Sequence, residues 1–228
     1  MRGEVAYWLA RLNRPDVLRA LNELSRRFTK WSRNDDRKLH RVMAYLHFTK
    51  QFRMKCKLDP DSPWELMLFV DADHSSSAEH PYSTSGSLLV IGGGSSYFPI
   101  SFQSKRQTAV SRSTTEAEAI SLATAVSQDA VPTVDHLYEI LGQEIPLTCF
   151  QDNDATIAVV RNGWSIKLRH VTKTHKIDLA CLYDLFKDPF TFLVHCPTDQ
   201  QAADVLTKNL EKGKWDMALS MLRVGPPE

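Results

Sequence analysis

Three β-strand patterns follow one another with no helical pattern between them, and this order constrains the fold more than any other feature of the chain. They cover residues 64–71, 85–91 and 96–102, and Gly92-Gly93-Gly94 forms a tight connection between the last two. Strands that follow one another in this way pair as an antiparallel meander. The sequence therefore predicts a sheet that begins with three antiparallel strands.

Helical and strand patterns alternate after residue 102. Apolar residues at helical spacing favour helices, short apolar runs favour strands, and Gly142 suits a helix end. The order β-β-β-α-β-α-β-α, with an extra helix or two, predicts an α/β fold with crossover connections. The expected elements are helices over 114–127 and 134–141, a strand over 146–151, helices over 155–161 and 174–186, a strand over 190–195 and a last helix over 199–210.

The segment before residue 58 has a helical periodicity of its own. One helix face collects Val17, Leu18, Leu21, Leu24 and Phe28. Prolines and turn-forming residues then interrupt every periodicity. We expect four parts, namely a small helical segment over 1–57, a linker over 58–63, the α/β domain over 64–210 and a C-terminal tail over 211–228.

Composition sets the broad class of the protein. Of its 228 residues, 43% are hydrophobic and 24% are charged, which suffices for one sizeable core and a smaller unit. No run approaches the roughly 20 apolar residues of a membrane span, and the first residues lack the apolar stretch of a secretory signal. We expect a cytoplasmic or nuclear protein without a membrane partner. The four cysteines are scattered without a CxxC pair, which favours reduced thiols over disulfides or a zinc site.

Local clusters of cationic side chains are a better indicator of nucleic-acid binding than the net charge of the chain. The formal charge of +1 neither requires nor excludes such a partner. Each of two clusters could follow a phosphate backbone or form a solvated surface. They comprise Arg26, Arg27, Lys30, Arg33, Arg37, Lys38 and Arg41 in the first segment, and Arg161, Lys167, Arg169, His170, Lys173, His175 and Lys176 in the domain.

Doubled acids stand at three ends of expected strands or helices. Strand ends hold side chains rigidly at a sheet edge, and a helix packed over the sheet can add another, so distant acids can converge. Their hard oxygen ligands favour Mg²⁺ or Mn²⁺, and two ions about 3.5–4 Å apart support phosphodiester cleavage. The acids are Asp71 and Asp73, Glu116 and Glu118, Asp152 and Asp154, with Asp204 early in the last helix.

Seven ordered motifs over about 140 residues resemble those of copia-type retrotransposon ribonuclease H. Two upstream stretches, Asn13-Arg14-Pro15-Asp16-Val17 and Arg41-Val42-Met43-Ala44-Tyr45-Leu46, resemble the segment after the polymerase palm in those polyproteins. The seven motifs are Phe69-Val70-Asp71-Ala72-Asp73, Ser83-Thr84-Ser85-Gly86, Gly92-Gly93-Gly94, Ser104-Lys105-Arg106-Gln107, Ser113-Thr114-Thr115-Glu116-Ala117-Glu118, Asp152-Asn153 and Ala203-Asp204-Val205-Leu206-Thr207-Lys208.

The resemblance implies both a fold and an activity. The fold would be a ribonuclease H-like mixed five-stranded sheet with helices on both faces, preceded by a small helical segment. The activity would be that of a metal-dependent endonuclease, a hydrolase that cuts the RNA strand of RNA/DNA hybrids with two Mg²⁺ ions, or with Mn²⁺. Its catalytic and metal-binding acids would be Asp71, Glu118, Asp152 and Asp204.

Physical reasons guide the choice within each pair of acids. Glu116 and Glu118 point about 200° apart around a helix, and Glu118 shares the core-facing side. Ser113-x-x-Glu116 fits a capping box instead. Asp152 ends its strand, whereas Asp154 falls in the first turn of a helix, where the backbone dipole stabilises an acid without any catalytic role.

Asp73 is less constrained than the other acids. It would share a face with Asp71 if the strand continues, and would then reach a metal through water. The alternative is an ordinary acid in a loop.

Two groups of cations are candidates for contact with the hybrid. Recognition would depend on hybrid shape and 2′-hydroxyls rather than on base sequence. The order His175-Lys176-Ile177-Asp178 departs from the Lys-His-Ile-Asp of the family, which leaves the role of His175 open. The candidates are Lys105, Arg106 and Arg112 before the Glu118 helix, and Arg169, Lys173, His175 and Lys176 beyond it.

Other functions remain compatible with the sequence. No Tyr-x-Asp-Asp motif of a polymerase is present, so the chain would be a fragment or a free-standing descendant, partnered by a reverse transcriptase domain or a larger assembly. The main alternative is a domesticated, catalytically inactive protein that binds nucleic acid or serves as a structural subunit of a larger assembly. Retention of all four acids favours the enzyme.

Overall fold

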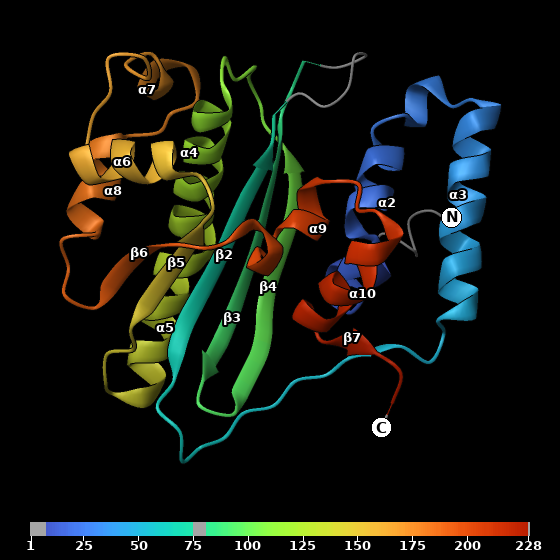
Figure 1. Ribbon diagram of the computed structural model, residues 1–228, viewed down its shortest axis with the longest axis horizontal. Helices are drawn as coiled ribbons and strands as arrows, with labels where there is room; N and C mark the ends of the chain where they lie inside the picture. Colours follow the sequence, from blue (N-terminus) through green and yellow to red (C-terminus); the bar gives the residue numbers. More distant parts are fainter. Residues whose placement is uncertain (1–7, 75–80, 228) are drawn as a thin grey trace. The chain divides into compact units, whose positions relative to one another are not determined.

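The computed structural model describes residues 8–74 and 81–227, which form two compact units (Figure 1). One unit comprises Met1–Lys55 with Lys208–Glu228, and the other comprises Cys56–Thr207. The larger unit contains the five-stranded sheet and every candidate site residue except those of the first basic cluster. In the part of the chain that the structure describes, no helix is both long and apolar enough to span a bilayer.

The larger unit is built on a mixed sheet with the strand order β4-β3-β2-β5-β6. Strands β2, β3 and β4 form the expected antiparallel meander, and β5 and β6 add to β2 in parallel. This arrangement confirms the ribonuclease H-like mixed five-stranded sheet. The strands span Glu65–Asp73 (β2), Thr84–Gly93 (β3), Ser96–Arg106 (β4), Leu147–Gln151 (β5) and Thr191–His195 (β6).

A glycine turn closes the hairpin between β3 and β4. Gly93 and Gly94 have φ angles of 108° and 56°, a region of backbone conformation that other residues rarely adopt. A Cβ atom on Gly93 would also collide with the carbonyl oxygen of Pro63. Glycine is therefore required at this turn, as the sequence suggested.

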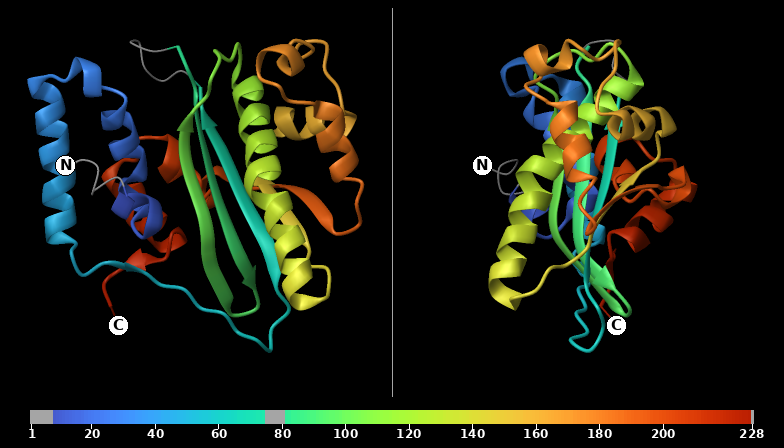
Figure 2. Two further views of the ribbon diagram at one scale, coloured as in Figure 1. Left: turned by 180° about the vertical axis from the view of Figure 1, so that it is seen from behind. Right: turned by 90° about the vertical axis from the view of Figure 1, so that its left-hand side faces the viewer.

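Helices lie on both faces of the sheet, as expected (Figures 1 and 2). On one face, Leu66, Leu68 and Val70 of β2 are fully buried in the core beneath α4, Thr114–Ala125. On the opposite face, α9, Asp204–Thr207, lies so close to β3 that a Cβ on Gly86 would stand 2.6 Å from Cγ2 of Thr207. The alternation of side chains along β2 thus separates a core face from a face that carries Asp71.

The two helices expected over 114–127 and 134–141 form one continuous run. A π-turn, Val126–Ala130, joins α4 to α5, Val131–Leu141. The turn changes the hydrogen-bond register just before Pro132, which has no N–H to donate. Gly142 ends the run with a φ of 66°, as predicted.

Two expected helices differ from the structure. The helix expected over 174–186 is shortened to α8, Leu179–Leu185, and a separate short helix, α7, Val171–Thr174, ends where it was expected to begin. Lys176, with a φ of 60°, lies between them and interrupts the helical conformation. The last helix, expected over 199–210, is reduced to a single turn over 198–200 and to α9. Between them Gln201 is extended, and tertiary contacts described below hold it there.

The helix expected over 155–161 is present as α6, Asp154–Asn162. Asn153 caps its first turn by accepting a hydrogen bond from the N–H of Thr156. The helix ends at Gly163, whose φ is 70°. It packs against α4 and α8, so it stabilises the α4 side of the sheet.

The smaller unit is mostly helical. Its buried pair Arg14–Asp16 has 2.8 Å between Nη2 and Oδ2, and the same Oδ2 of Asp16 accepts a hydrogen bond from the hydroxyl of Tyr45. Phe28 is 67% exposed instead of sharing the buried face, because the helix ends at Ser25. The elements are short helical turns over Pro15–Val17 and Phe28–Lys30, α2 (Leu18–Ser25), α3 (Arg33–Phe48), α10 (Lys212–Met221), and strands β1 (Arg53–Met54) and β7 (Val224–Gly225).

The stretch that we set apart as a tail over 211–228 has structure of its own. It contributes α10 and β7, and β7 pairs antiparallel with β1. A two-residue strand persists only with a partner, so this pairing explains why the stretch belongs to the unit of the N-terminal segment.

Candidate metal centre

The register of β2 and β5 places two acids opposite each other. Parallel pairing of these strands ends at Phe69 and Phe150, whose rings stack with centroids 4.7 Å apart. Asp71 and Asp152 each follow two residues later, so both point to the same face as the stacked rings. Asp71 and Asp152 therefore lie close together because of the register between β2 and β5.

A buried glutamine occupies the gap where the two strands diverge. Nε2 of Gln201 donates to the carbonyl oxygen of Val70 at 3.0 Å and to that of Phe150 at 3.4 Å. These are the last carbonyls before the gap, and burying them without a partner would be costly. Gln201 thus fixes the spacing between the strands that carry Asp71 and Asp152.

Glu118 joins the two aspartates from helix α4. One oxygen each of Asp71, Glu118 and Asp152 lies within 4.8 Å of the other two. Among the residues that the structure describes, this is the sole group of three or more acids, histidines or cysteines so close together. Asp71 and Glu118 are buried and Asp152 is half-buried, so the group opens to solvent on the Asp152 side.

The electrostatics of this acidic triad indicate a cation site. Burial, together with the charges of Asp71 and Asp152, raises the pKa of the Glu118 carboxyl to about 9. Three ionised carboxylates at this spacing repel one another in a buried place, and a divalent cation would relieve that repulsion. The triad can therefore hold a metal ion through oxygen ligands.

Several neutral side chains support the triad, and sequence reasoning did not find them. The hydroxyl of Thr207 donates to Oδ2 of Asp71, and Nε2 of Gln151 donates to Oε2 of Glu118 at 3.4 Å. The hydroxyl of Thr198 donates to Oδ2 of Asp152 at 3.2 Å. Only Thr207 had a signal in the sequence, since it lies in the motif that contains Asp204.

Asp204 lies near this group without being part of it. It begins α9, three residues before Thr207, and is half-buried. Burial, with the charges of Asp152, Asp199 and Asp204, raises the pKa of the Cys196 thiol to about 11. Asp204 and Asp152 are thus both close enough to Cys196 to share its electrostatic environment.

The remaining doublet acids lie outside the triad. Asp73 ends β2, and the side chain of Asp154 is 86% exposed. Glu116 is buried, but it faces a different group of residues. Its Oε1 is 3.0 Å from Nε2 of His170 and 3.5 Å from Nε2 of His175.

The expected capping box is only half present. The hydroxyl of Ser113 accepts a hydrogen bond from the N–H of Glu116, as predicted. The side chain of Glu116 reaches past Ser113 and accepts from the N–H of Arg112 at 3.0 Å. Its other oxygen is hydrogen-bonded to His170, with Nε2 of His175 3.5 Å away, so the carboxylate lies away from the cap position.

Six of the seven candidate substrate-binding residues are exposed. His175 differs, since its side chain is only 2% exposed and burial lowers the pKa of its imidazole. Its ring faces Glu116 rather than solvent, so it is not placed to contact a phosphate. The exposed candidates are Lys105, Arg106, Arg112, Arg169, Lys173 and Lys176.

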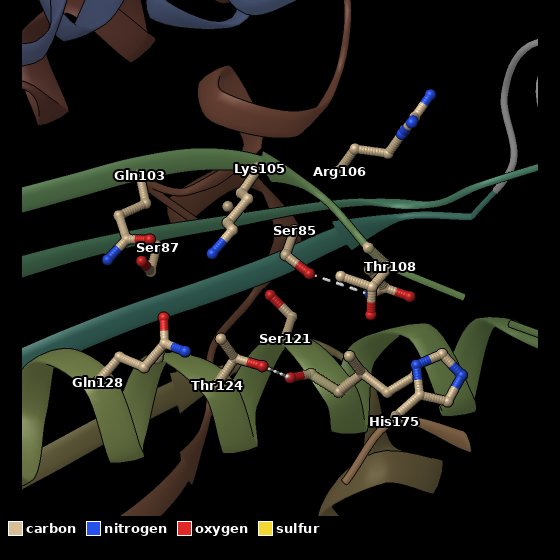
Figure 3. Close-up of a pocket in the computed structure, with 14 residues that line it drawn as sticks. Ser85, Ser87, Gln103, Lys105, Arg106, Thr108, Ser121, Thr124, Gln128 and His175 are labelled. Carbon is tan, nitrogen blue, oxygen red and sulfur yellow. Dashed lines mark hydrogen bonds between the residues drawn. The ribbon is translucent and has the colours of Figure 1, made fainter. Parts of the chain in front are cut away.

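The two cations at the end of β4 have different surroundings (Figure 3). Lys105 points into a polar hollow between β3, β4 and α4, which Ser85, Gln103 and Thr124 also line. Arg106 points away from α4 and lies over the ring of Tyr82, with its Cζ 4.8 Å from the centroid. Lys105 and Arg106 therefore present charge in different directions.

Comparison with curated proteins identifies relatives over most of the chain. No family model matches the sequence. The retrovirus-related Pol polyprotein from transposon RE1 of Arabidopsis thaliana is 29% identical over 202 residues, which cover 87% of this chain and 13% of that protein. The Pol polyprotein from transposon TNT 1-94 of Nicotiana tabacum is 25% identical over 92% of this chain and 15% of its own length. The chain thus spans a small part of these relatives.

A shorter relative is also similar. Secreted RxLR effector protein 161 of Plasmopara viticola is 31% identical over 129 residues, which cover 57% of this chain and 85% of that protein.

The solved structures that match this chain are less similar to it in sequence. LC11-RNase H1, isolated from compost, matches 68% of this chain and 98% of its own chain at 17% identity, with a TM-score of 0.43. The foamy viral protease-reverse transcriptase in complex with dsDNA matches 74% of this chain and 30% of its own, at 16% identity and a TM-score of 0.40. The fold assignment rests on strand order and direction rather than on these scores.

Proposed function

Since this chain is distantly homologous to copia-type retrotransposon Pol polyproteins over most of its length, we propose that its larger unit is a ribonuclease H. It would act as an endonuclease that hydrolyses the RNA strand of RNA/DNA hybrids. The observation that carries this proposal is the convergence of Asp71, Glu118 and Asp152 on one sheet edge, from three elements distant in sequence. The relatives are much longer proteins, so a polymerase domain is a proposed partner as well.

The donor set fits hard divalent cations. All three groups of the triad are carboxylates, which suit Mg²⁺ or Mn²⁺ better than softer metals. We assign Asp204 as a fourth ligand on the solvent side, because it begins the helix whose Thr207 binds Asp71. When bound, a pair of such ions supplies an activated water and stabilises the leaving oxygen.

The protein's own residues would orient the hybrid and hold the ligands in place. Gln201 holds strands β2 and β5, which carry Asp71 and Asp152, and Thr207 holds the carboxylate of Asp71. Little reorganisation of these ligands would therefore be needed when a cation binds. The exposed cations would bind phosphates on either side of the cut, which adds affinity without selecting a base sequence.

The neighbouring acids Asp152 and Asp154 allow a matched test of this function. With Mg²⁺ and a labelled RNA/DNA hybrid, Asp152→Asn should lower the cleavage rate by roughly 100-fold or more, because transition-state stabilisation worth several kcal/mol is lost. Asp154→Asn removes the same charge from an exposed side chain two residues away and should cleave like the native protein.

The outcomes separate the candidate functions. Equal cleavage by both variants would reject the assigned site. Binding of the hybrid without cleavage by the native protein would instead support an inactive, nucleic-acid-binding descendant.

A further inference from the structure

One buried carboxylate contacts the residues at both ends of helix α7. His170 is the residue before α7, Val171–Thr174, and His175 is the residue after it. Nε2 of His170 lies 3.0 Å from Oε1 of Glu116, and Nε2 of His175 lies 3.5 Å from the same oxygen. We call Glu116, His170 and His175 the α7 clamp.

The clamp is a closed, buried arrangement rather than a surface pair. The side chains of Glu116 and His175 are 1% and 2% exposed. Burying a carboxylate is costly unless hydrogen bonds compensate, and here Oε2 also accepts from the N–H of Arg112. Glu116 therefore connects the start of α4 to the α7 segment in a fixed geometry.

Helix α7 needs such support. Four residues cannot form a stable helix alone, because the first turn fixes several dihedral angles for a single hydrogen bond. The chain then passes through Lys176 with a φ of 60°, a conformation that a lysine adopts only when its surroundings require it. Tertiary contacts must determine this segment: Leu168, Val171 and Ile177 are buried in the core. The clamp adds a hydrogen bond between Glu116 and His170 and a close contact between Glu116 and His175 at the two ends of α7.

The clamped segment carries three exposed cations, Arg169, Lys173 and Lys176. Lys173 lies inside α7, and the other two each adjoin a clamp histidine. Glu116, at the other end of the connection, is two residues from Glu118 of the acidic triad on the same helix. The position of these cations relative to the triad is therefore set through Glu116.

We propose that the α7 clamp positions the cations of residues 169–176 to bind the phosphates of a nucleic acid whose backbone passes the acidic triad. This inference rests on the proposed nuclease function and adds to it a determinant of substrate affinity. Glu116, His170 and His175 are positioning residues and do not touch the reacting atoms. Their loss should weaken binding of the hybrid and leave the chemical step nearly unchanged.

The clamp can be tested without any assay of activity. Trypsin cuts after Arg169, Lys173 and Lys176, so its rate there measures how often the segment opens. Glu116→Gln keeps the size of the side chain but loses the charge and one acceptor, and should raise this cleavage rate about tenfold, as loss of about 1.4 kcal/mol of local stability would. Glu139→Gln, an exposed acid on α5, is the control and should leave the rate unchanged. An unchanged rate in Glu116→Gln would overturn the clamp.

Two variants of His170 control for a general disturbance of α4 by the Glu116 substitution. His170→Gln retains an N–H donor near the position of Nε2, whereas His170→Leu has none. We expect His170→Leu to behave like Glu116→Gln in trypsin, and His170→Gln to recover most of the native resistance. Equal rates for the two variants would show that the contact to Glu116 does not hold the segment.

Hybrid cleavage then tests the role in binding. Glu116→Gln and His170→Leu should raise KM roughly tenfold with kcat within about twofold, and the salt dependence of hybrid affinity should weaken by about one unit of slope for each phosphate that is no longer bound. Unchanged KM and slope, or a fall in kcat alone, would overturn the inference while leaving the nuclease function intact. Failure of the native protein to bind or cut hybrids would instead reject the proposed function and, with it, the clamp's role in substrate binding.

Discussion

At the scale of single residues, Glu118 dominates the energetics of the metal-free site. Its carboxyl has a pKa of about 9, against 4.5 for an exposed glutamate, because it is buried beside two other acids. The folded protein keeps this group protonated over a range in which the unfolded chain ionises it. Stability from this group is therefore fully present below about pH 4.5 and is lost as the pH rises through about 9.

Replacing the charge should remove this pH dependence. In a chelator at about pH 8, Glu118→Gln should melt several degrees above the native protein, since each kcal/mol shifts Tm by roughly 2–4 °C in a chain of this size. Near pH 4.5 the two should melt together, because the native carboxyl is then protonated. Thermal unfolding followed by circular dichroism gives both values. Parallel pH profiles would contradict the raised pKa of Glu118.

Thr207 is the residue through which α9 contacts Asp71, a proposed metal ligand. Its hydroxyl donates to Oδ2 of Asp71, and partners of metal ligands typically contribute 10–100-fold in metal affinity. Thr207→Val, which keeps the shape and removes the hydroxyl, should raise the Mg²⁺ concentration for half-maximal cleavage about tenfold. Thr207→Ser keeps the hydroxyl and should stay close to the native value. If Thr207→Val and Thr207→Ser required the same Mg²⁺ concentration in this titration, the hydrogen bond would not support Asp71.

At the scale of elements, close contact between α9 and β3 holds the site together. Gly86 makes this contact possible, since a Cβ there would stand 2.6 Å from Thr207, 3.0 Å from Leu206 and 3.2 Å from the carbonyl oxygen of Ala203. Two of these neighbours are the helix's own buried side chains, and they cannot move without shifting α9. The packing of one short helix thus depends on one glycine in the facing strand.

Gly86→Ala should displace α9 and affect stability and activity together. Overpacking of this kind typically costs about 1–3 kcal/mol, and the displaced Thr207 would no longer support Asp71. Gly213→Ala in α10 is a suitable control, because a Cβ there meets nothing within 4 Å and alanine favours a helix. The free energy of unfolding, measured with denaturant, and the rate of hybrid cleavage should both fall for Gly86→Ala. Both should stay at the native value for Gly213→Ala. A Gly86→Ala protein with native stability would show that α9 is not tightly packed.

At the scale of the whole molecule, cation binding should stabilise the folded chain. The triad exists only after strands β2 and β5 and helix α4 have come together, so a metal binds the folded state alone. Mg²⁺ or Mn²⁺ should raise Tm, with about 2.7 kcal/mol gained at a concentration 100 times Kd. Asp71→Asn should abolish the shift. A shift that persists in this variant would place the cation elsewhere.

Calcium should separate binding from catalysis. Its ligands are also oxygen atoms, so it should raise Tm as Mg²⁺ does. Its looser coordination positions water poorly, and cleavage of the hybrid should be slow. Cleavage in Ca²⁺ as fast as in Mg²⁺ would argue against the proposed metal-assisted reaction.

The sequence alone determined the sheet and singled out the three acids that converge in the structure. Alternating strands, glycine turns and alanine-rich helices depend on local propensity and side-chain spacing, and these are properties of short stretches of chain. The same patterns placed Asp71, Glu118 and Asp152 at the ends or on the faces of their elements. Their convergence follows from strand register, with Phe69 opposite Phe150.

Only the tertiary structure decided how the polar residues are paired. Gln201 breaks the expected last helix because two buried carbonyls on β2 and β5 need its amide, and no local pattern records that requirement. In the same way, Glu116 leaves its helix cap for a hydrogen bond with His170, more than fifty residues away, and lies beside His175. Buried polar groups must find partners wherever the fold supplies them, so such contacts are fixed by packing rather than by neighbouring sequence.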